Sequence, residues 1–405
     1  MIFLTRAPLS KRLIAFSFGV VALGVFVACA DSDVAPSPEP DASSNITPGS
    51  DGGLDAQPDS VVDAANDVDA GPRVCSDENF CHTTPPPKLT LASVWSDGNG
   101  IAWAGTKSGA ILRWNGTDWK VHATGLGEIK AIWGASPTEI WAVGANGIFQ
   151  GRGSSSETVT FTPNDLPGEG PVGLNAVWGS GPNDVWAAGA RLDGVEPSGR
   201  VFHFMGATSG SGSAMWMLDR VSSSARDFAH VWGSAESGVW VVGTCTIDQT
   251  TKHCILRRPV GALAWEDVEL PPHPDVTEGK AFPALVFAAG MSGADIWLNA
   301  ITDKYQFAFY HGTSTDDGVS FDWTVVPYSR DPYDSEYTAL AVSGTEVWAV
   351  GGYGRLRSWD GKKFTQAAIA VKKNVPVTDS FFGVWASGGE VWAVGEGIAL
   401  HRPKN

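Results

Sequence analysis

Five acidic residues recur at equivalent positions of a repeated pattern, and they are the first candidates for acid–base chemistry. Each lies two residues before a tryptophan: Glu139, Asp184, Asp295, Glu346 and Glu390. A positioned carboxylate can act as a general base, but five equivalent positions cannot all do so. Each acid falls where a turn would enter a strand, so we interpret the set as turn or strand-start residues.

The histidines show no metal-binding spacing. The chain has eight of them, and none forms a His-Glu-x-x-His or other paired motif: His82, His122, His203, His230, His253, His273, His311 and His401. His230 is distinctive, because it stands two residues before a repeated Trp where other copies have Ser or smaller residues. We expect its ring to approach the centre of the fold, either as a functional group or as a filler. No metal or other cofactor is predicted.

The cysteines indicate disulfides in an exported chain. Five are present, and Cys29 is either lipidated or lost with the leader, which leaves an even number. Cys245 and Cys254 are expected to face each other across one hairpin loop, 246–253, so Cys75 and Cys81 pair by elimination. Metal binding is the alternative for these four, although neither pair has Cys-x-x-Cys spacing.

Motifs of familiar enzymes are absent from the sequence. It contains no Gly-x-Ser-x-Gly elbow, no phosphate-binding Gly-x-x-x-x-Gly-Lys loop and no dinucleotide-binding Gly-x-Gly-x-x-Gly. We therefore name no catalytic residue and favour a protein that is not an enzyme. A glycosidase carboxylate pair stays open, because such a pair can be assembled from distant parts of a repeat fold.

The N-terminal segment 1–29 is predicted to be a signal peptide. Three basic residues precede Leu13–Ala28, a run without charge that is short for a membrane span. Phe26-Val27-Ala28-Cys29 resembles a bacterial lipobox, which would make Cys29 the lipidated N-terminus. We expect a lipid-anchored protein of the outer membrane or cell surface, and the alternative is ordinary secretory cleavage that releases a soluble protein.

Residues 30–72 are expected to form a disordered tether. This segment carries ten acids and no base, lacks aromatic residues, and is rich in Asp, Ala, Pro and Ser. Such a composition cannot bury enough apolar surface to offset the entropy of ordering. The overall charge is −16, the body itself is only mildly acidic, and it has no basic stripe for nucleic acid.

Residues 73–405 contain one unit repeated seven times. The unit reads apolar-Trp-Gly-Ser, a polar turn, an acid, and apolar-Trp-Ala-Val-Gly. Its second Trp recurs at intervals of 38 to 57 residues: Trp103, Trp141, Trp186, Trp240, Trp297, Trp348 and Trp392. Copies five and six lack the first Trp, and we assign its place to Phe287 and Val342. Intervals near 40–50 residues are typical of propeller blades.

Each copy divides into four short strands, which predicts an all-β, seven-bladed β-propeller of four-stranded antiparallel blades. In the third copy these strands are expected at Asn175–Gly179, Asp184–Gly189, Gly199–Met205 and Met215–Val221. The last copy ends after its third strand, and an unassigned stretch, Phe80–Pro87, precedes the first. We expect this N-terminal strand to complete blade seven and close the ring. The tryptophans then serve as packing between blades.

The repeat resembles the Asp-box (BNR) and photosystem II assembly factor-like propellers, with kelch- and WD-like repeats as wider relatives. The resemblance rests on Asn115-Gly116-x-x-Trp119 and Asp360-Gly361-x-x-Phe364, and Ser358-Trp359-Asp360-Gly361 comes nearest to an Asp-box. The segment Val177–Trp186 also resembles a phrase found in lipid-anchored bacterial surface proteins. This resemblance implies a fold and no particular function.

Loops between second and third strands are the expected ligand-contact surface. They are long in three consecutive blades, at 191–198, 246–253 and 301–305. The candidate ligand-binding residues are Arg191, Asp193, Glu196, His230, Asp248 and His253. We expect a monomeric, non-catalytic module that binds protein or glycan, or serves as a scaffold. An exported carbohydrate-active hydrolase or lyase is the alternative.

Overall fold

The computed structural model describes residues 75–404 apart from 169, 193–197, 207–214, 224–226, 248–249, 317, 329–336, 368 and 370–375. The signal segment, the tether and the lipidation of Cys29 lie outside this range and stay predictions. The described residues belong to one compact unit, 66–405. Within them, no helix is long and apolar enough to cross a membrane.

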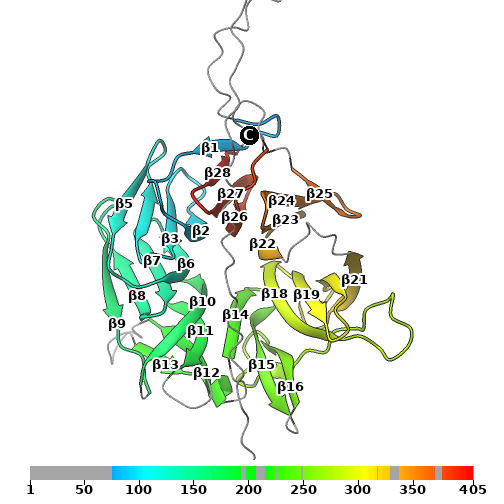
Figure 1. Ribbon diagram of the computed structural model, residues 1–405. Helices are drawn as coiled ribbons and strands as arrows, with labels where there is room; N and C mark the ends of the chain where they lie inside the picture. The colour runs from blue at the N-terminus through cyan, green and yellow to red at the C-terminus, as the bar shows by residue number, and fades with distance from the viewer. Residues whose placement is uncertain are drawn as a thin grey trace, which may run out of the picture. The chain divides into compact units, whose positions relative to one another are not determined.

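The described residues form seven four-stranded antiparallel sheets, which confirms the predicted fold class (Figure 1). Blade 1 contains β2 (Leu91–Ser96), β3 (Ala102–Thr106), β4 (Ile111–Trp114) and β5 (Trp119–Ala123). Blade 2 contains β6 (Ile129–Ser136), β7 (Glu139–Gly144), β8 (Gly147–Arg152) and β9 (Thr160–Asn164). Blade 3 contains β10 (Val172–Gly181), β11 (Asp184–Arg191), β12 (Ser198–Met205) and β13 (Met215–Leu218), and η1 (Arg220–Ser223) follows it.

The remaining blades repeat this order. Blade 4 contains β14 (Asp227–Ser234), β15 (Gly238–Ile247), β16 (Thr250–Arg258) and β17 (Glu266–Asp267). Blade 5 contains β18 (Pro283–Ser292), β19 (Asp295–Thr302), β20 (Phe307–Thr313) and β21 (Asp322–Tyr328). Blade 6 contains β22 (Tyr337–Ser343), β23 (Glu346–Gly351), β24 (Arg355–Trp359) and β25 (Phe364–Gln366). Blade 7 contains β26 (Phe381–Ser387), β27 (Glu390–Gly395), β28 (Ala399–Arg402) and β1 (Cys81–Thr83).

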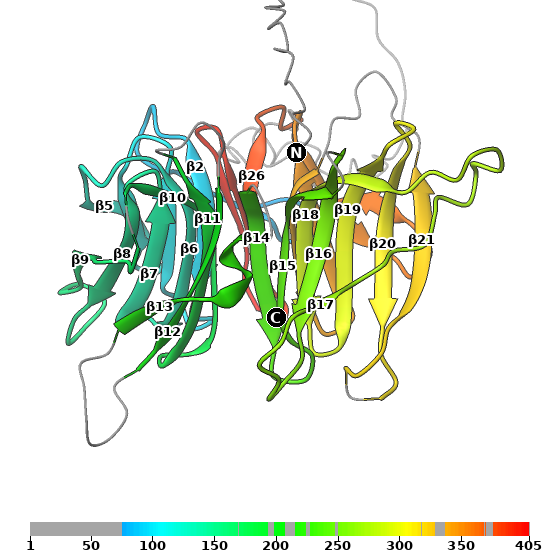
Figure 2. The same ribbon diagram turned by 90° about the horizontal axis from the view of Figure 1, so that it is seen from below.

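The first strands of the blades form a closed inner ring. Each first strand contacts the first strands of the two neighbouring blades, and β26 of blade 7 contacts β2 of blade 1. Figure 2 shows the strands running between two rims of this ring. A blade buries its faces only against its neighbours, so ring closure is a condition for stability.

The N-terminal strand closes the ring as predicted. β1 pairs antiparallel with β28, where Cys81 lies opposite His401. The Thr83 hydroxyl donates to the Ala399 carbonyl at 2.9 Å and accepts from Trp119 Nε1 of blade 1 at 2.9 Å. A disulfide joins Cys75 to Cys81, and a second joins Cys245 to Cys254, as expected. The ends of the propeller are thus bound to each other and to the first blade.

Repeated residues build the blade interfaces. All 18 tryptophans are buried or half-buried, as expected of residues that pack within and between blades. The glycine that ends the second strand is required by a close approach. A Cβ at Gly144 would lie 1.7 Å from the Glu128 main-chain oxygen, so no other residue fits there.

Two details of the predicted repeat are wrong. Strand register places Gly290 and Ala341 opposite the second Trp of blades 5 and 6, so these residues replace the first Trp instead of Phe287 and Val342. In both blades the counterpart of the first Trp lies seven residues before the second Trp, as Trp385 does before Trp392 in blade 7, whereas Phe287 and Val342 do not have this spacing. The expected loop 246–253 is largely strand, because β15 and β16 continue to Ile247 and from Thr250.

Candidate functional site

The propeller has two faces with different connections. One face carries the turns between second and third strands together with the links from blade to blade, and we call it the 2–3 face. The other carries the turns between first and second and between third and fourth strands, and we call it the 1–2 face. Strand order in every blade fixes this division, since alternate strands run in opposite directions.

The expected contact residues are only partly described by the structure. Asp193, Glu196 and Asp248 lie outside the described residues. Arg191 ends β11 at the 2–3 face and is partly exposed. The ligand-contact role of these loops therefore remains a prediction. The 2–3 turns of blades 1, 5 and 6 lie within the described residues.

His230 and His253 come together in blade 4. His230 hydrogen-bonds the main chain of Val286 and Phe287 in the next blade, and burial lowers its pKa to about 4. Burial also lowers the pKa of His253 to about 4, and the nearby His230 adds to this effect. Both rings are thus neutral near pH 7. The bonds of His230 to blade 5 favour its role as a filler that joins two blades.

The 2–3 turn of blade 5 holds a tyrosine in a strained conformation. Tyr305 has φ of 60°, in the left-handed region that a bulky residue rarely adopts, yet its side chain is 81% exposed. The buried Thr302 fixes this turn: its carbonyl accepts from Tyr305 N at 3.0 Å, and its hydroxyl accepts from Gln306 N at 3.1 Å. Such strain persists where surrounding bonds enforce it, and it often marks a functional site.

Blade 1 contains the same turn with glycine in this position. Gly109 N donates to the Thr106 carbonyl at 3.2 Å, and Ala110 N donates to the Thr106 hydroxyl at 2.8 Å. Gly109 has φ of 83°, which costs glycine little. The tyrosine in blade 5 is therefore not required by the turn, and it projects an aromatic ring that contributes nothing to the core.

Blade 6 repeats this feature beside blade 5. Tyr353, in the next 2–3 turn, has φ of 56° and is 70% exposed. Two further exposed apolar residues, Phe282 and Leu285, lie at the start of blade 5 on the same face. Phe282 is held in place because its amide donates to Asp303 Oδ1 at 3.1 Å and its carbonyl accepts from Asp303 N at 2.9 Å. We call Phe282, Leu285, Tyr305 and Tyr353 the tyrosine rim.

The recurring acids are the first residues of second strands, as expected, and they bond to groups of their own or the neighbouring blade. In blade 7, Glu390 Oε1 accepts from Trp392 Nε1 at 2.8 Å and lies 3.1 Å from His401 Nε2, while this histidine stacks on the same Trp. Burial opposes ionisation of the Glu390 carboxyl, but hydrogen bonds from His401, Trp392 and Ser96 outweigh burial and lower the pKa of Glu390.

Blade 3 repeats this arrangement. Asp184 Oδ1 lies 2.6 Å from His203 Nε2 and accepts from Trp186 Nε1 at 2.9 Å. These acid–histidine pairs resemble catalytic pairs in composition, but they are saturated by bonds to the scaffold. Their recurrence in several blades indicates construction rather than catalysis.

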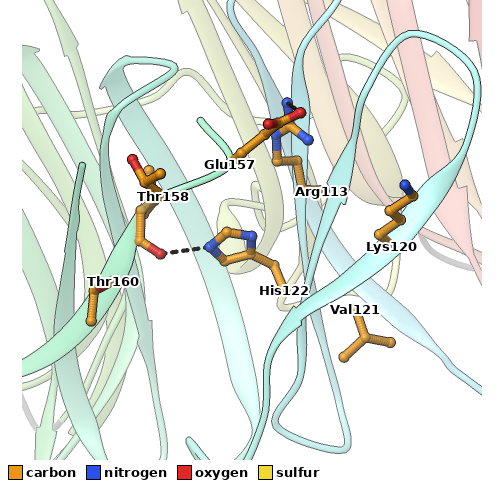
Figure 3. Close-up of a pocket in the computed structure, with 8 residues that line it drawn as sticks. Arg113, Lys120, Val121, His122, Glu157, Thr158 and Thr160 are labelled. Atoms are coloured by element: carbon orange, nitrogen blue, oxygen red, sulfur yellow. Dashed lines mark hydrogen bonds and ion pairs between the residues drawn. The ribbon is translucent and has the colours of Figure 1, made fainter. Parts of the chain in front are cut away.

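One surface pocket lies between the outer strands of blades 1 and 2 (Figure 3). Arg113 Nη2 donates to Ser156 Oγ at 2.7 Å and lies 3.7 Å from Glu157, and His122 Nε2 lies 2.6 Å from the Val159 carbonyl. Figure 3 shows His122 directed at the segment of blade 2 that bears Thr158. The polar groups of this pocket thus join two blades.

The sequence reasoning missed the tyrosine rim. Loop 301–305 was named as long, but neither Tyr305 nor Tyr353 was chosen. A signal was available: Thr302-Asp303-Lys304-Tyr305 matches Thr106-Lys107-Ser108-Gly109, with Tyr where glycine is expected. Only the positive φ of Tyr305 shows that this substitution strains the backbone.

Comparisons with known proteins extend to the fold alone. No family model and no curated protein matches the chain. A structure of YCF48 bound to a D1 peptide is 17% identical with a TM-score of 0.53, covering 82% of this chain and all of that one. An extracellular domain from B. thetaiotaomicron, BT4673, is 11% identical with a TM-score of 0.51, covering 80% of this chain and 39% of that one. The chain is thus a seven-bladed β-propeller, and its Asp-box resemblance stays a prediction.

Proposed function

We propose that this chain is an exported, membrane-anchored propeller that binds a protein ligand at the tyrosine rim without catalysing a reaction. The observation that carries the proposal is Tyr305, an 81% exposed aromatic residue in a left-handed conformation that glycine occupies in the sister turn of blade 1. Exposed Tyr anchors are enriched at protein interfaces, since they bury a large area at little entropic cost.

The rim has the composition of an interface. Phe282 and Leu285 are 45% and 41% exposed and lie next to the turn of Tyr305. The turns are held by main-chain bonds, so binding orders little additional structure. YCF48, a propeller of the same fold, is bound to a D1 peptide in its structure, and we extend peptide binding to this chain as part of the proposal.

Export and anchoring complete the proposal. Two disulfides are expected of chains that fold in an oxidising compartment. Cys29 after an uncharged run supplies a lipid anchor, and residues 30–72 provide a tether. Cys29→Ala should move the protein from the membrane to the soluble fraction of fractionated cells. A variant that remains in the membrane would contradict the anchor and leave the binding proposal intact.

Selection from a displayed peptide library tests the binding proposal. The purified full-length chain should enrich peptides that the double variant Tyr305→Gly/Tyr353→Gly fails to enrich. Leu263→Gly is the matched control, because Leu263 is 84% exposed but lies in the turn between β16 and β17 on the 1–2 face. Equal enrichment by wild type and double variant would contradict the proposal.

A glycan array with a parallel hydrolysis assay tests the other ligand class. Tyr rings also stack on sugars, so binding without turnover would replace the protein ligand with a glycan. Turnover would replace the proposal with a carbohydrate hydrolase or lyase. Two carboxylates at the mouth of the 2–3 face would favour an enzyme, whereas the described pocket that contains two carboxylates lies on the 1–2 face.

A further inference from the structure

A groove between blades 5 and 6 opens on the 1–2 face, away from the tyrosine rim. Its volume is about 450 Å³, and its walls include Asp295, Trp297, His311, Trp359 and Asp360. Two tryptophans and two carboxylates thus border one space. None of the described residues that line it is Lys or Arg.

The acid of this groove is less well satisfied than its counterparts. Asp295 Oδ2 lies 3.0 Å from His311 Nε2, and Oδ1 is buried without a hydrogen-bond partner. In the matching position of blade 3, Asp184 accepts from Trp186, His203 and Ser180. The Asp295 side chain is 35% exposed, so its carboxylate reaches the groove. Because Oδ1 is buried, a ligand in the groove meets Oδ2, which can accept a further hydrogen bond beside the one to His311.

The second carboxylate is already compensated. Asp360 Oδ1 accepts from the amides of Lys362 and Lys363 at 2.8 Å each. These main-chain bonds, together with the charges of the two lysines, lower the pKa of Asp360. The charge of Asp360 is thus offset by the two lysines, and Asp295 is the carboxylate that remains for a ligand.

The equivalent position between blades 6 and 7 is filled by an arginine of the chain itself. Between blades 6 and 7, Arg402 Nη2 donates to Glu346 Oε1 at 2.9 Å, and its guanidinium carbon lies 4.7 Å from the centre of the Trp348 ring. Glu346 and Trp348 are the counterparts of Asp295 and Trp297. Arg402 follows His401 on β28, and the matching residue on β24 is Trp359, which follows Ser358.

The groove of blades 5 and 6 thus has the acid and the aromatic walls but lacks the arginine. Trp359 packs against Trp297 at 4.9 Å between ring centres and leaves the space beside Asp295 open. We propose that this groove binds the guanidinium group of an arginine side chain from a protein partner. A guanidinium pairs with the carboxylate, as Arg402 does within the chain, and stacks on the half-buried Trp359, because Trp297 is only 1% exposed and its ring is already stacked on His311.

Titration with N-acetyl-arginine amide, followed by saturation-transfer NMR on the full-length chain, tests this site. We expect saturable binding, about tenfold weaker for the neutral isostere N-acetyl-citrulline amide. Asp295→Asn should weaken arginine binding by a similar factor, because it removes the charge and keeps the shape. Asp184→Asn is the matched control, because it alters the same position of a blade whose acid is saturated, and it should leave binding unchanged.

Several outcomes would overturn the site. Equal binding of citrulline and arginine amides, or wild-type affinity in Asp295→Asn, would show that the carboxylate does not recognise a cation. Preferential binding of a neutral sugar such as maltose would make the groove a glycan site. If Asp295→Asn fails to fold, Thr345→Trp decides: Thr345 is an exposed lining residue, and a Trp there should block arginine binding. Unchanged binding in that variant would also contradict the proposal.

Discussion

The 2–3 turns of blades 1 and 5 share one set of hydrogen bonds and differ in what they present. In both turns a buried threonine, Thr106 or Thr302, holds the backbone through its carbonyl and its hydroxyl. Blade 1 places Gly109 in the left-handed position, and blade 5 places an exposed Tyr305 there. The scaffold is thus the same in both blades, and the departure from it is a side chain directed at solvent. Residues that recur in every blade build the scaffold, and we take the strained tyrosine that departs from the repeat as the candidate for a functional residue.

Replacement of Gly109 by the tyrosine of blade 5 has the largest expected effect on stability. Gly109→Tyr should destabilise the protein by about 4 kcal/mol or prevent folding, because a Cβ at Gly109 would lie 2.7 to 2.9 Å from main-chain atoms of Gly127. Denaturant unfolding measures this loss. A Gly109→Tyr variant as stable as wild type would mean that the two turns tolerate either residue, and the comparison would fail.

The pH dependence of stability tests whether the two buried histidines of blade 4 have a structural role. The pKa values of His230 and His253 are lowered to about 4, so the folded chain binds fewer protons than the unfolded chain between about pH 4 and pH 6.5. The free energy of unfolding should therefore fall as pH drops through this window, by up to about 1.4 kcal/mol per pH unit for each histidine.

The variant His230→Ser tests whether His230 causes this fall of the free energy of unfolding with pH. Blade 1 has Ser93 in the matching position, so the substitution fits the repeat. The slope of stability against pH between 4 and 6.5 should become shallower, while unfolding at pH 8 changes less. An unaltered slope would show that His230 does not titrate in this way.

Removal of the threonine hydroxyl should affect both turns equally. Thr106→Val removes the hydroxyl acceptor of Ala110 N, and Thr302→Val removes that of Gln306 N and Lys304 N, at a cost of about 1 to 3 kcal/mol in each turn. Paired unfolding curves measure the difference between them. Similar losses would support one shared scaffold, and a loss confined to blade 1 would show that the turn of Tyr305 is held by something else.

The smallest expected effect is a gain in stability rather than a loss. Tyr305→Gly should stabilise the fold by about 0.5 kcal/mol, because relief of left-handed strain exceeds the entropy that glycine adds to the unfolded chain. Thermal unfolding with Tyr353→Gly as a parallel variant measures this gain. Clear destabilisation would show that the exposed ring packs against the fold and is not held there for a ligand.

Much of the fold was predictable because it is repetitive. The seven recurrences of the second Trp, the turn residues and the position of Phe80–Pro87 were enough to infer seven blades and a closing N-terminal strand. Cysteine spacing also predicted both disulfides. The first-strand residues of blades 5 and 6 were misassigned, because the small residues Gly290 and Ala341 occupy the place of the first Trp and only the strand pairing identifies them.

The candidate sites were much less predictable. Tyr305 is distinguished by its backbone angle and exposure, and neither property is visible in a list of residues. The groove at Asp295 arises because residues of two blades meet and one carboxylate oxygen lacks a partner. The sequence has an acidic residue at this position of the repeat in five copies, so only three-dimensional contacts distinguish Asp295 from the other four.

The central claim is that Tyr305 and Tyr353 retain strain in order to bind a protein ligand. Affinity for a library-selected peptide and the free energy of unfolding, measured together on Tyr305→Gly/Tyr353→Gly, test this claim most directly. We predict that affinity falls at least about tenfold while stability is maintained or increased. Wild-type affinity in a fully folded double variant would contradict the account.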